Sequence, residues 1–179
     1  MLTARLVVRL VVFSTVLMLL SATWVMAQTL RFDPDPVVPT EPNFMVPLVL
    51  EAGGLEVKGV EAIVSFDPAL VTLVSVTPGP WYILSGQTFF FWDYTTSGTD
   101  RIHFASAMLQ GTSSSDGIIA YCHFSMVSFG SCPLDFIEGD VRDINNDPLP
   151  FALDPGLILL DPAVGRETST LDGLKALFR

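Results

Sequence analysis

The side chains that could carry out chemistry are few and scattered in this sequence. Only two histidines, His103 and His123, could exchange protons near neutral pH, and neither stands in a motif with a nucleophile. The serine run at 113–115 lacks the strand-turn-helix setting of a nucleophile elbow. Each histidine alternates with apolar neighbours, which is typical of a strand with an outward imidazole. The sequence therefore predicts no nucleophilic or acid–base centre, and we expect a protein that is not an enzyme.

Carboxylates are abundant, but their spacing selects no pair. A glycosidase needs two carboxylates across a cleft, and nothing in the sequence brings together any two of Asp93, Glu138 and Asp140. Segment 143–147 (DINND) places oxygen ligands at alternate positions, as in a calcium loop, but lacks the central glycine and the distal glutamate. A turn in which Asp and Asn side chains bond the backbone fits it better. We expect no metal site and no cofactor.

Any functional side chains must be positioned by β-strands. Short runs of Val, Ile, Leu and Phe alternate with polar residues and are separated by Gly, Pro, Asn and Asp. In one run Val60, Ala62 and Val64 share a face, while Glu61 and Ile63 lie opposite. Further strands are expected at 44–50, 70–76, 87–94, 101–107, 117–127, 132–138 and 156–161. Because each strand has one apolar face, two sheets must cover each other, and the sequence predicts an all-β, two-sheet β-sandwich of about nine strands.

Two of these strands carry more specific expectations. Pro47 cannot donate a ladder hydrogen bond, so it predicts a sheet edge or a β-bulge at that position. Leu70, Val74 and Val76 continue a period of two and are expected to share the buried face.

The two ends of the chain differ from the middle. Residues 1–27 have the layout of a secretory signal peptide, with Arg5 and Arg9 before an apolar run and small residues ahead of Gln28. Cleavage would make the protein secreted, at the cell surface or extracellular, whereas an uncleaved segment would anchor it to a membrane. The sandwich is expected over 28–162, followed over 163–179 by a linker and a short amphipathic C-terminal helix or tail.

Charge and length bound the partners and the core. The chain carries a net charge of −10, and removal of 1–27 leaves seven basic against nineteen acidic residues, a net charge of −12. Such a chain repels a phosphate backbone, so nucleic acid is not an expected partner. The remaining 152 of 179 residues suit one domain that buries about 68–70 % of its unfolded surface.

The aromatic run and the two cysteines each leave alternatives open. Segment 89–94 (FFFWDY) places large rings on both faces of a strand, so outward rings could contact protein or sugar unless loops or the tail cover them. Cys122 and Cys132 belong to an exported chain, where they could form a disulfide or remain two buried thiols.

Four stretches together resemble cohesin modules, the bacterial β-sandwiches that bind dockerin modules. They are FMVPLVL with VKGVEAIVSFDPALVTLVSVTPG, FFFWDYTTSGTDRIHFA, GIIAYCHFSM, and CPLDFIEGDVRDINNDPLPFALDPGLILL. The resemblance covers about 30–160 and implies a jelly-roll topology, with the partner docking on the sheet of strands 8, 3, 6 and 5. It also implies that strands 7 and 8 lie in opposite sheets, about 10 Å apart at mid-sandwich, so a disulfide would fit only near the end of the sandwich.

Carried over by register, the resemblance gives five partner-binding residues. They are Glu61, Ile63, Trp92, Arg101 and His103. The leading hypothesis is a secreted, non-catalytic, cohesin-like module that recognises a dockerin-like protein partner through one sheet face. The alternative is a carbohydrate-binding sandwich that stacks a polysaccharide on the 89–94 aromatics and assists polysaccharide catabolism.

Overall fold

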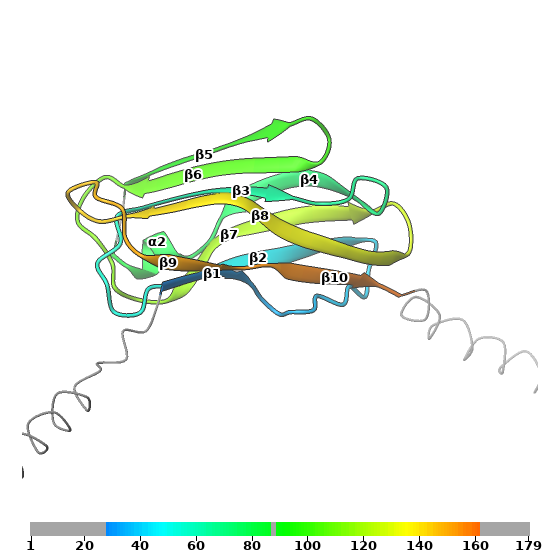
Figure 1. The fold of residues 1–179 in the computed structure, drawn as a ribbon, viewed down its shortest axis with the longest axis horizontal. Coiled ribbons are helices and arrows are strands. Elements are labelled where there is room, and N and C mark those ends of the chain that lie inside the picture. Colours follow the sequence, from blue (N-terminus) through cyan, green and yellow to red (C-terminus); the bar gives the residue numbers. More distant parts are fainter. Residues whose placement is uncertain (1–27, 87–88, 162–179) are drawn as a thin grey trace, which may run out of the picture.

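Two five-stranded sheets face each other in the computed structural model, which describes residues 28–86 and 89–161 (Figure 1). The expected signal peptide at 1–27 and the tail at 163–179 lie outside the described residues. Within those described, no helix has the length and apolar character needed to cross a membrane. The elements are β1 (Gln28–Phe32), β2 (Asn43–Glu51), β3 (Gly59–Ser65), β4 (Val71–Pro78), α2 (Trp81–Leu84), β5 (Phe90–Ser97), β6 (Arg101–Met108), β7 (Gly117–Met126), β8 (Gly130–Arg142), β9 (Phe151–Asp154) and β10 (Gly156–Leu160).

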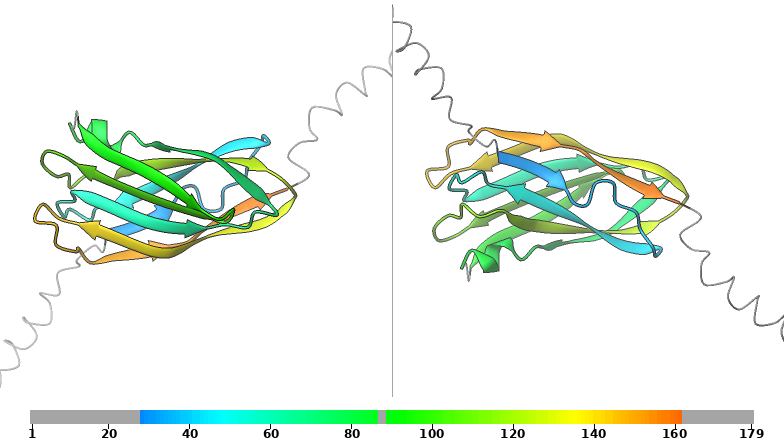
Figure 2. Two further views of the ribbon diagram at one scale, coloured as in Figure 1. Left: turned by 90° about the horizontal axis from the view of Figure 1, so that it is seen from above. Right: turned by 90° about the horizontal axis from the view of Figure 1, so that it is seen from below.

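The strand order confirms the jelly-roll sandwich. Sheet A has the order β4-β7-β2-β1-β9 and sheet B the order β10-β8-β3-β6-β5, and Figure 2 shows sheet B from above and sheet A from below. The described residues form ten strands, close to the expected number of about nine, and the closing segment divides at Pro155 into two of them. There β9 pairs in parallel with β1 in sheet A, and β10 pairs with β8 in sheet B. A Cβ at Gly156 would lie 2.8 Å from the Phe32 ring, so glycine allows this close crossing.

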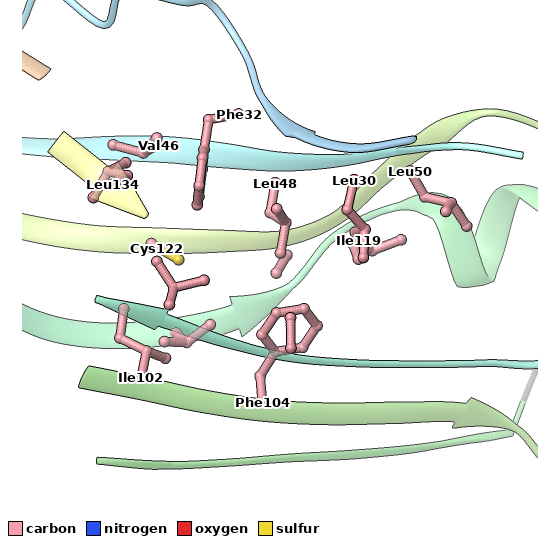
Figure 3. Close-up of a cluster of buried hydrophobic side chains, with 14 of the residues drawn as sticks. Leu30, Phe32, Val46, Leu48, Leu50, Ile102, Phe104, Ile119, Cys122 and Leu134 are labelled. Atoms are coloured by element: carbon pink, nitrogen blue, oxygen red, sulfur yellow. The ribbon is translucent and has the colours of Figure 1, made fainter. Parts of the chain in front are cut away.

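The period-two pattern places the core as expected. Val60, Ala62 and Val64 of β3 are buried, and Glu61 between them is exposed. The core side chains come from both sheets and meet between them, as Figure 3 shows for Leu48 of β2 and Phe104 of β6. Each buried aliphatic or aromatic side chain contributes about 1.5–3 kcal/mol to folding, so this paired layer is the main stabilising feature.

Two β-bulges explain the local departures from the pattern. The expectation that Val74 is buried is wrong, since a register shift between Leu73 and Ser75 leaves it 63 % exposed and returns Val76 to the core. An extra residue reverses the facing of every residue that follows, which a strict period of two cannot represent. The expectation of a sheet edge or a bulge at Pro47 is wrong, since β2 is an interior strand and Pro47 pairs regularly with Tyr121. The register shift nearby lies between Leu48 and Val49, and the extra residue is Ile119 of β7.

The short helix α2 is a feature that strand periodicity missed. It places Trp81 and Tyr82, 1 % and 0 % exposed, at the end of the core. The Trp81 indole donates a hydrogen bond to the carbonyl oxygen of Ser115 (2.7 Å), and the Tyr82 hydroxyl donates one to Ser106 Oγ (2.5 Å). Because both polar tips have partners, these rings can be buried without an unsatisfied group.

Cys122 and Cys132 are free, buried thiols. Of the two alternatives that the sequence left open, the structure therefore has two buried thiols and no disulfide between them. Cys122 belongs to β7 of sheet A and Cys132 to β8 of sheet B, and Figure 3 shows Cys122 pointing into the core. The Cys132 thiol instead accepts a hydrogen bond from the backbone N–H of Asp67 (3.5 Å). Burial raises the pKa of the Cys122 thiol from 9.0 to about 12 and also raises that of Cys132.

We expect the native protein to react with a thiol reagent at least about tenfold more slowly than the unfolded protein, because the reactive thiolate is suppressed. Both thiols have raised pKa values when folded, so their contribution to stability is complete below pH 9.0 and is lost as the pH rises toward about 12. Reagent titration with and without denaturant, together with urea unfolding at pH 8 and pH 10, measures both effects. A mass 2 Da below the reduced value would instead show a disulfide.

Candidate protein-binding face

The outer face of sheet B carries four rows of side chains, set by strand register. In the central rows, Asp140, Glu61, Ala105 and Asp93 lie side by side, followed by Glu138, Ile63, His103 and Thr95. The flanking rows contain Arg142, Gly59, Ala107 and Phe91 on one side and Asp135, Ser65, Arg101 and Ser97 on the other. Because side chains alternate along each strand, these residues share the face that points away from the core.

The structure brings four of the five predicted partner-binding residues together on this face. Ile63 lies between Glu138 and His103, and His103 Nε2 lies 2.6 Å from Glu61 Oε1. Arg101 begins β6, the strand that also carries His103, and its Nε lies 3.9 Å from Asp100 Oδ2. Both pairs are exposed, so each contributes little to stability, and their polar groups stay accessible to a partner.

Trp92 is not on this face, and that part of the prediction is wrong. Its ring packs on the core side of β5, 6.0 Å from the Phe104 ring and 6.3 Å from the Tyr82 ring. Phe90 stacks on Tyr82 in the same layer, at 4.4 Å. The outward aromatic residue of β5 is Phe91, which is 49 % exposed.

A depression of about 230 Å³ opens on the same face. Its floor is formed by small residues, Gly59, Ala105 and Ala107, and Phe91 lines it together with Arg142. A Cβ at Gly59 would meet only ordinary contacts, 3.4 Å from the Ser106 carbonyl oxygen and 3.7 Å from the Ala107 Cβ. Packing within the domain therefore does not require glycine here, and its absent side chain leaves room for another molecule.

These depression residues escaped the sequence analysis, although a signal was present. Ala105 and Ala107 occupy the outward positions that follow Arg101 and His103 on one strand. Two successive small residues at outward strand positions leave a depression in the surface of the sheet, because no large side chain covers the backbone there. The neighbours of Ala107 on the adjacent strands, Gly59 on one side and Phe91 on the other, are set by strand register and could not be predicted from one strand.

Acidic groups dominate the charge of the face. Asp140, Glu61 and Asp93 occupy one row, and Glu138 lies in the next. Arg142 is held at the rim, where its Nε lies 2.6 Å from Asp140 Oδ2 and its Nη1 donates a hydrogen bond to the Asn146 carbonyl oxygen (2.8 Å). A surface with this balance attracts a basic partner and steers its approach.

The groups weighed for catalysis are held apart or already bonded. Asp93 and Asp140 share a row but are three strand spacings apart, about 14 Å, beyond the range of a glycosidase pair. His123 is on sheet A, hydrogen-bonded to Thr77 Oγ1 at 2.9 Å. Ser113 and Ser115 hydrogen-bond each other in a loop. Over residues 28–86 and 89–161, no group of three or more His, Cys, Asp or Glu side chains has the arrangement of a metal site.

Segment 143–147 is the turn that its sequence favours. Asp143 Oδ1 accepts hydrogen bonds from the backbone N–H groups of Asn145 (2.8 Å) and Asp147 (2.9 Å). Asn146 adopts φ 69°, a left-handed conformation that asparagine tolerates well. This turn presents the Asn146 carbonyl oxygen to Arg142 and so orients a charge at the depression.

Comparison with known proteins identifies the fold. No family model and no curated protein matches the sequence. The structure is similar to a non-cellulosomal cohesin from the archaeon Archaeoglobus fulgidus, with a TM-score of 0.62 and 20 % identity over 76 % of this chain and 93 % of that one. It is also similar to a cohesin of Clostridium acetobutylicum (TM-score 0.61, 19 % identity, 75 % and 92 % covered).

A third similar structure is a complex. It contains the sixth cohesin of scaffoldin B from Acetivibrio cellulolyticus bound to a Cel5 dockerin, and its TM-score is 0.61 at 15 % identity, with 75 % of this chain and 99 % of that chain covered. At these identities the likeness establishes the architecture. By its fold, residues 28–161 of this chain form a cohesin-like domain.

Proposed function

We propose that this chain is an exported, non-catalytic module that binds a dockerin-type protein through the outer face of sheet B. The observation that carries the proposal is the depression floored by Gly59, Ala105 and Ala107 beside Phe91. Support also comes from the fold, because several of the similar cohesins form complexes with dockerins.

The face has the features of a moderate-sized protein interface. A standard interface buries about 800 Å² on each partner and depends on a few central anchors within a polar rim. Ile63 and Phe91 supply apolar area, and the row of Asp140, Glu61 and Asp93 that lies between them supplies negative charge. The small residues of the depression let a partner approach the sheet closely. The expected partner surface therefore combines apolar residues opposite Ile63 and Phe91 with basic residues opposite the acidic row between them.

The non-catalytic assignment is supported by how the reactive groups are used. His103 is paired with Glu61, His123 with Thr77, and the cysteines are buried. A catalytic base needs a substrate within hydrogen-bonding reach and a neighbour that orients it. On sheet B the one histidine lies on an open surface, which water reaches freely.

Export is proposed from the leader at 1–27. Mass measurement of the protein recovered from culture medium tests this part, and an N-terminus at Gln28 is the expected result.

The carbohydrate-binding alternative now depends on other rings than expected. Trp92 faces the core, which leaves Phe89 and Phe91, 66 % and 49 % exposed, as the outward aromatics of the run. Two phenylalanines give a smaller stacking platform than one that includes tryptophan. Retention on an insoluble polysaccharide that is lost in Phe91→Ala would favour this alternative.

We expect Ile63→Ala to weaken dockerin binding by about thirtyfold, the effect of removing a central anchor worth about 2 kcal/mol. Isothermal titration against a panel of recombinant dockerins, including the Cel5 dockerin of Acetivibrio cellulolyticus, first selects the ligand that the unaltered protein binds best. The matched control is Met45→Ala, which removes a 55 % exposed side chain from the opposite sheet and should leave affinity unchanged.

Two outcomes would contradict the proposal. If no dockerin in the panel binds, the proposal of a dockerin-type partner is contradicted. If Met45→Ala weakens binding as much as Ile63→Ala, the partner docks on sheet A instead.

A further inference from the structure

The two sheets have four edge strands, and three of them are protected against pairing with another chain. The edges are β4 and β9 of sheet A and β10 and β5 of sheet B. β4 contains a bulge at Val74 and ends in Pro78, and β9 is only four residues long. β10 is covered by Val37, whose N–H and C=O bond to Leu157 and Leu159. Bulges, proline, shortness and covering segments are the ordinary means of protecting an edge.

The fourth edge, β5, has none of these protections. It runs for eight residues without a register shift, and its sequence FFWDYTTS contains no proline and no basic residue. In the part of the chain that the structure describes, it pairs with β6 alone. Figure 1 shows β5 at the outer border of the molecule. A long, regular edge of this kind is a template for an added strand.

The hydrogen bonds of β6 show which groups of β5 point outward. The N–H of Met108 bonds to Lys58, on the β3 side, and the N–H of Leu109 bonds to Phe89, on the β5 side. In an antiparallel ladder these directions alternate, so the odd-numbered residues of β5 bond β6. The even-numbered residues therefore direct their backbone N–H and C=O groups away from the sheet: Phe90, Trp92, Tyr94 and Thr96.

The side chains along this edge indicate which residue types an added strand would need on each of its two faces. On the core side, Phe90, Trp92 and Tyr94 pack against the core yet remain partly exposed, so they would gain burial from apolar residues beside them. On the outer side, Asp93 is exposed, and no basic side chain of the described residues forms a salt bridge with it. Because side chains alternate, one strand can present apolar residues inward and a basic residue outward.

We propose that β5 takes up an extended segment of a partner protein as an additional strand of sheet B, with apolar residues at alternate positions and a lysine or arginine beside Asp93. A second copy of this chain is a poorer match, because the chain carries a net charge of −10 and its β5 offers Asp93 rather than a base. The proposal concerns the strand edge rather than the outer face, so it stands or fails independently of dockerin binding.

The test uses a nine-residue peptide of alternating threonine and valine with a central lysine, capped at both ends, and a twin peptide with glutamate in place of lysine. Fluorescence anisotropy measures affinity for the full chain, and amide hydrogen exchange locates the site. The lysine peptide is expected to bind about fivefold more tightly than the glutamate peptide and to slow exchange at Trp92, Tyr94 and Thr96.

The decisive variants are a proline and an alanine substitution at one outward-pointing backbone N–H of β5. Thr96→Pro removes an outward donor without removing a bond to β6, whereas Thr96→Ala keeps the donor. We expect the proline variant to bind the lysine peptide at least about fivefold more weakly, which corresponds to one lost hydrogen bond, and the alanine variant to bind normally. Circular dichroism checks that both remain folded.

Three results would overturn the proposal. One is equal binding by the proline and alanine variants, which would place the peptide elsewhere. Another is the absence of binding and of protection at β5 with either peptide. The third is a stable dimer, detected by light scattering, that Thr96→Pro dissociates, because the edge would then serve a second copy.

Discussion

Trp81→Ala is expected to lower the free energy of unfolding by about 3–5 kcal/mol, the usual cost of deleting a large buried aromatic side chain. The Trp81 ring is 1 % exposed and packs edge-on against Tyr82 at 5.2 Å. It also fills the space over Gly117, where an added Cβ would lie only 2.8 Å from the ring. The substitution leaves a cavity at that end of the core, and it removes the hydrogen bond to the Ser115 carbonyl oxygen. Urea denaturation followed by tryptophan fluorescence and circular dichroism measures the loss.

Ile83→Ala in the same four-residue helix is the matched control. Ile83 is 70 % exposed, so its removal should change stability by no more than about 0.5 kcal/mol. The comparison separates burial from helix formation, because both substitutions introduce the same strong helix former. Equal losses for the two variants would contradict the prediction, because burial of the Trp81 ring would then not account for the loss of stability.

The short helix also shows a limit of predicting secondary structure from the periodicity of hydrophobic residues. Four residues span about one turn, too few to produce a helical pattern, so Trp81 and Tyr82 look like the start of the aromatic run that continues at Phe89. Their burial arises from contacts with distant parts of the chain, Ser106 and the loop at Ser115. No local pattern contains that information.

The long strands were predictable because each has one solvent-exposed face and one buried face. β3 and β6 follow the alternation without interruption, which is why the facings of Ile63 and His103 were correct. β4 departs from it at Val74, because the bulge there inserts a residue. β1 and β9 were missed since they are short, and β9 becomes a strand only by pairing with β1, more than a hundred residues away.

Trp92 illustrates the limit for the candidate site. The run at 89–94 has aromatic residues at both odd and even positions, so hydrophobicity alone could not decide which set faces the core. Register decides it: Trp92 pairs with Ser106 and Phe91 with Ala107, which puts Trp92 on the side of buried Phe104. The same strand pairing places the acidic row of Asp140, Glu61 and Asp93 and the depression on the outer face.

Gly59 offers the sharpest test of that depression. Its Cβ position is free of close contacts, and strand β3 has ordinary alternation there, so larger residues should fold normally. Each added carbon would occupy space that the partner is proposed to fill. In the series Gly59→Ala, Gly59→Leu and Gly59→Trp, we expect the affinity for the selected dockerin to fall by about twofold, tenfold and at least a hundredfold.

Gly79 and Thr72 are the contrasting controls for this series. A Cβ at Gly79 would lie 2.1 Å from the Ile118 carbonyl oxygen, so Gly79→Ala should lower the midpoint of thermal unfolding, whereas the Gly59 variants should keep it within a few degrees. Thr72→Trp introduces the same indole ring at an exposed position of sheet A and should leave dockerin affinity unchanged. Titration calorimetry at equal protein concentrations compares all of them. If Gly59→Trp folds normally and still binds with full affinity, the depression is not part of the interface, because an indole standing on its floor would otherwise exclude the partner.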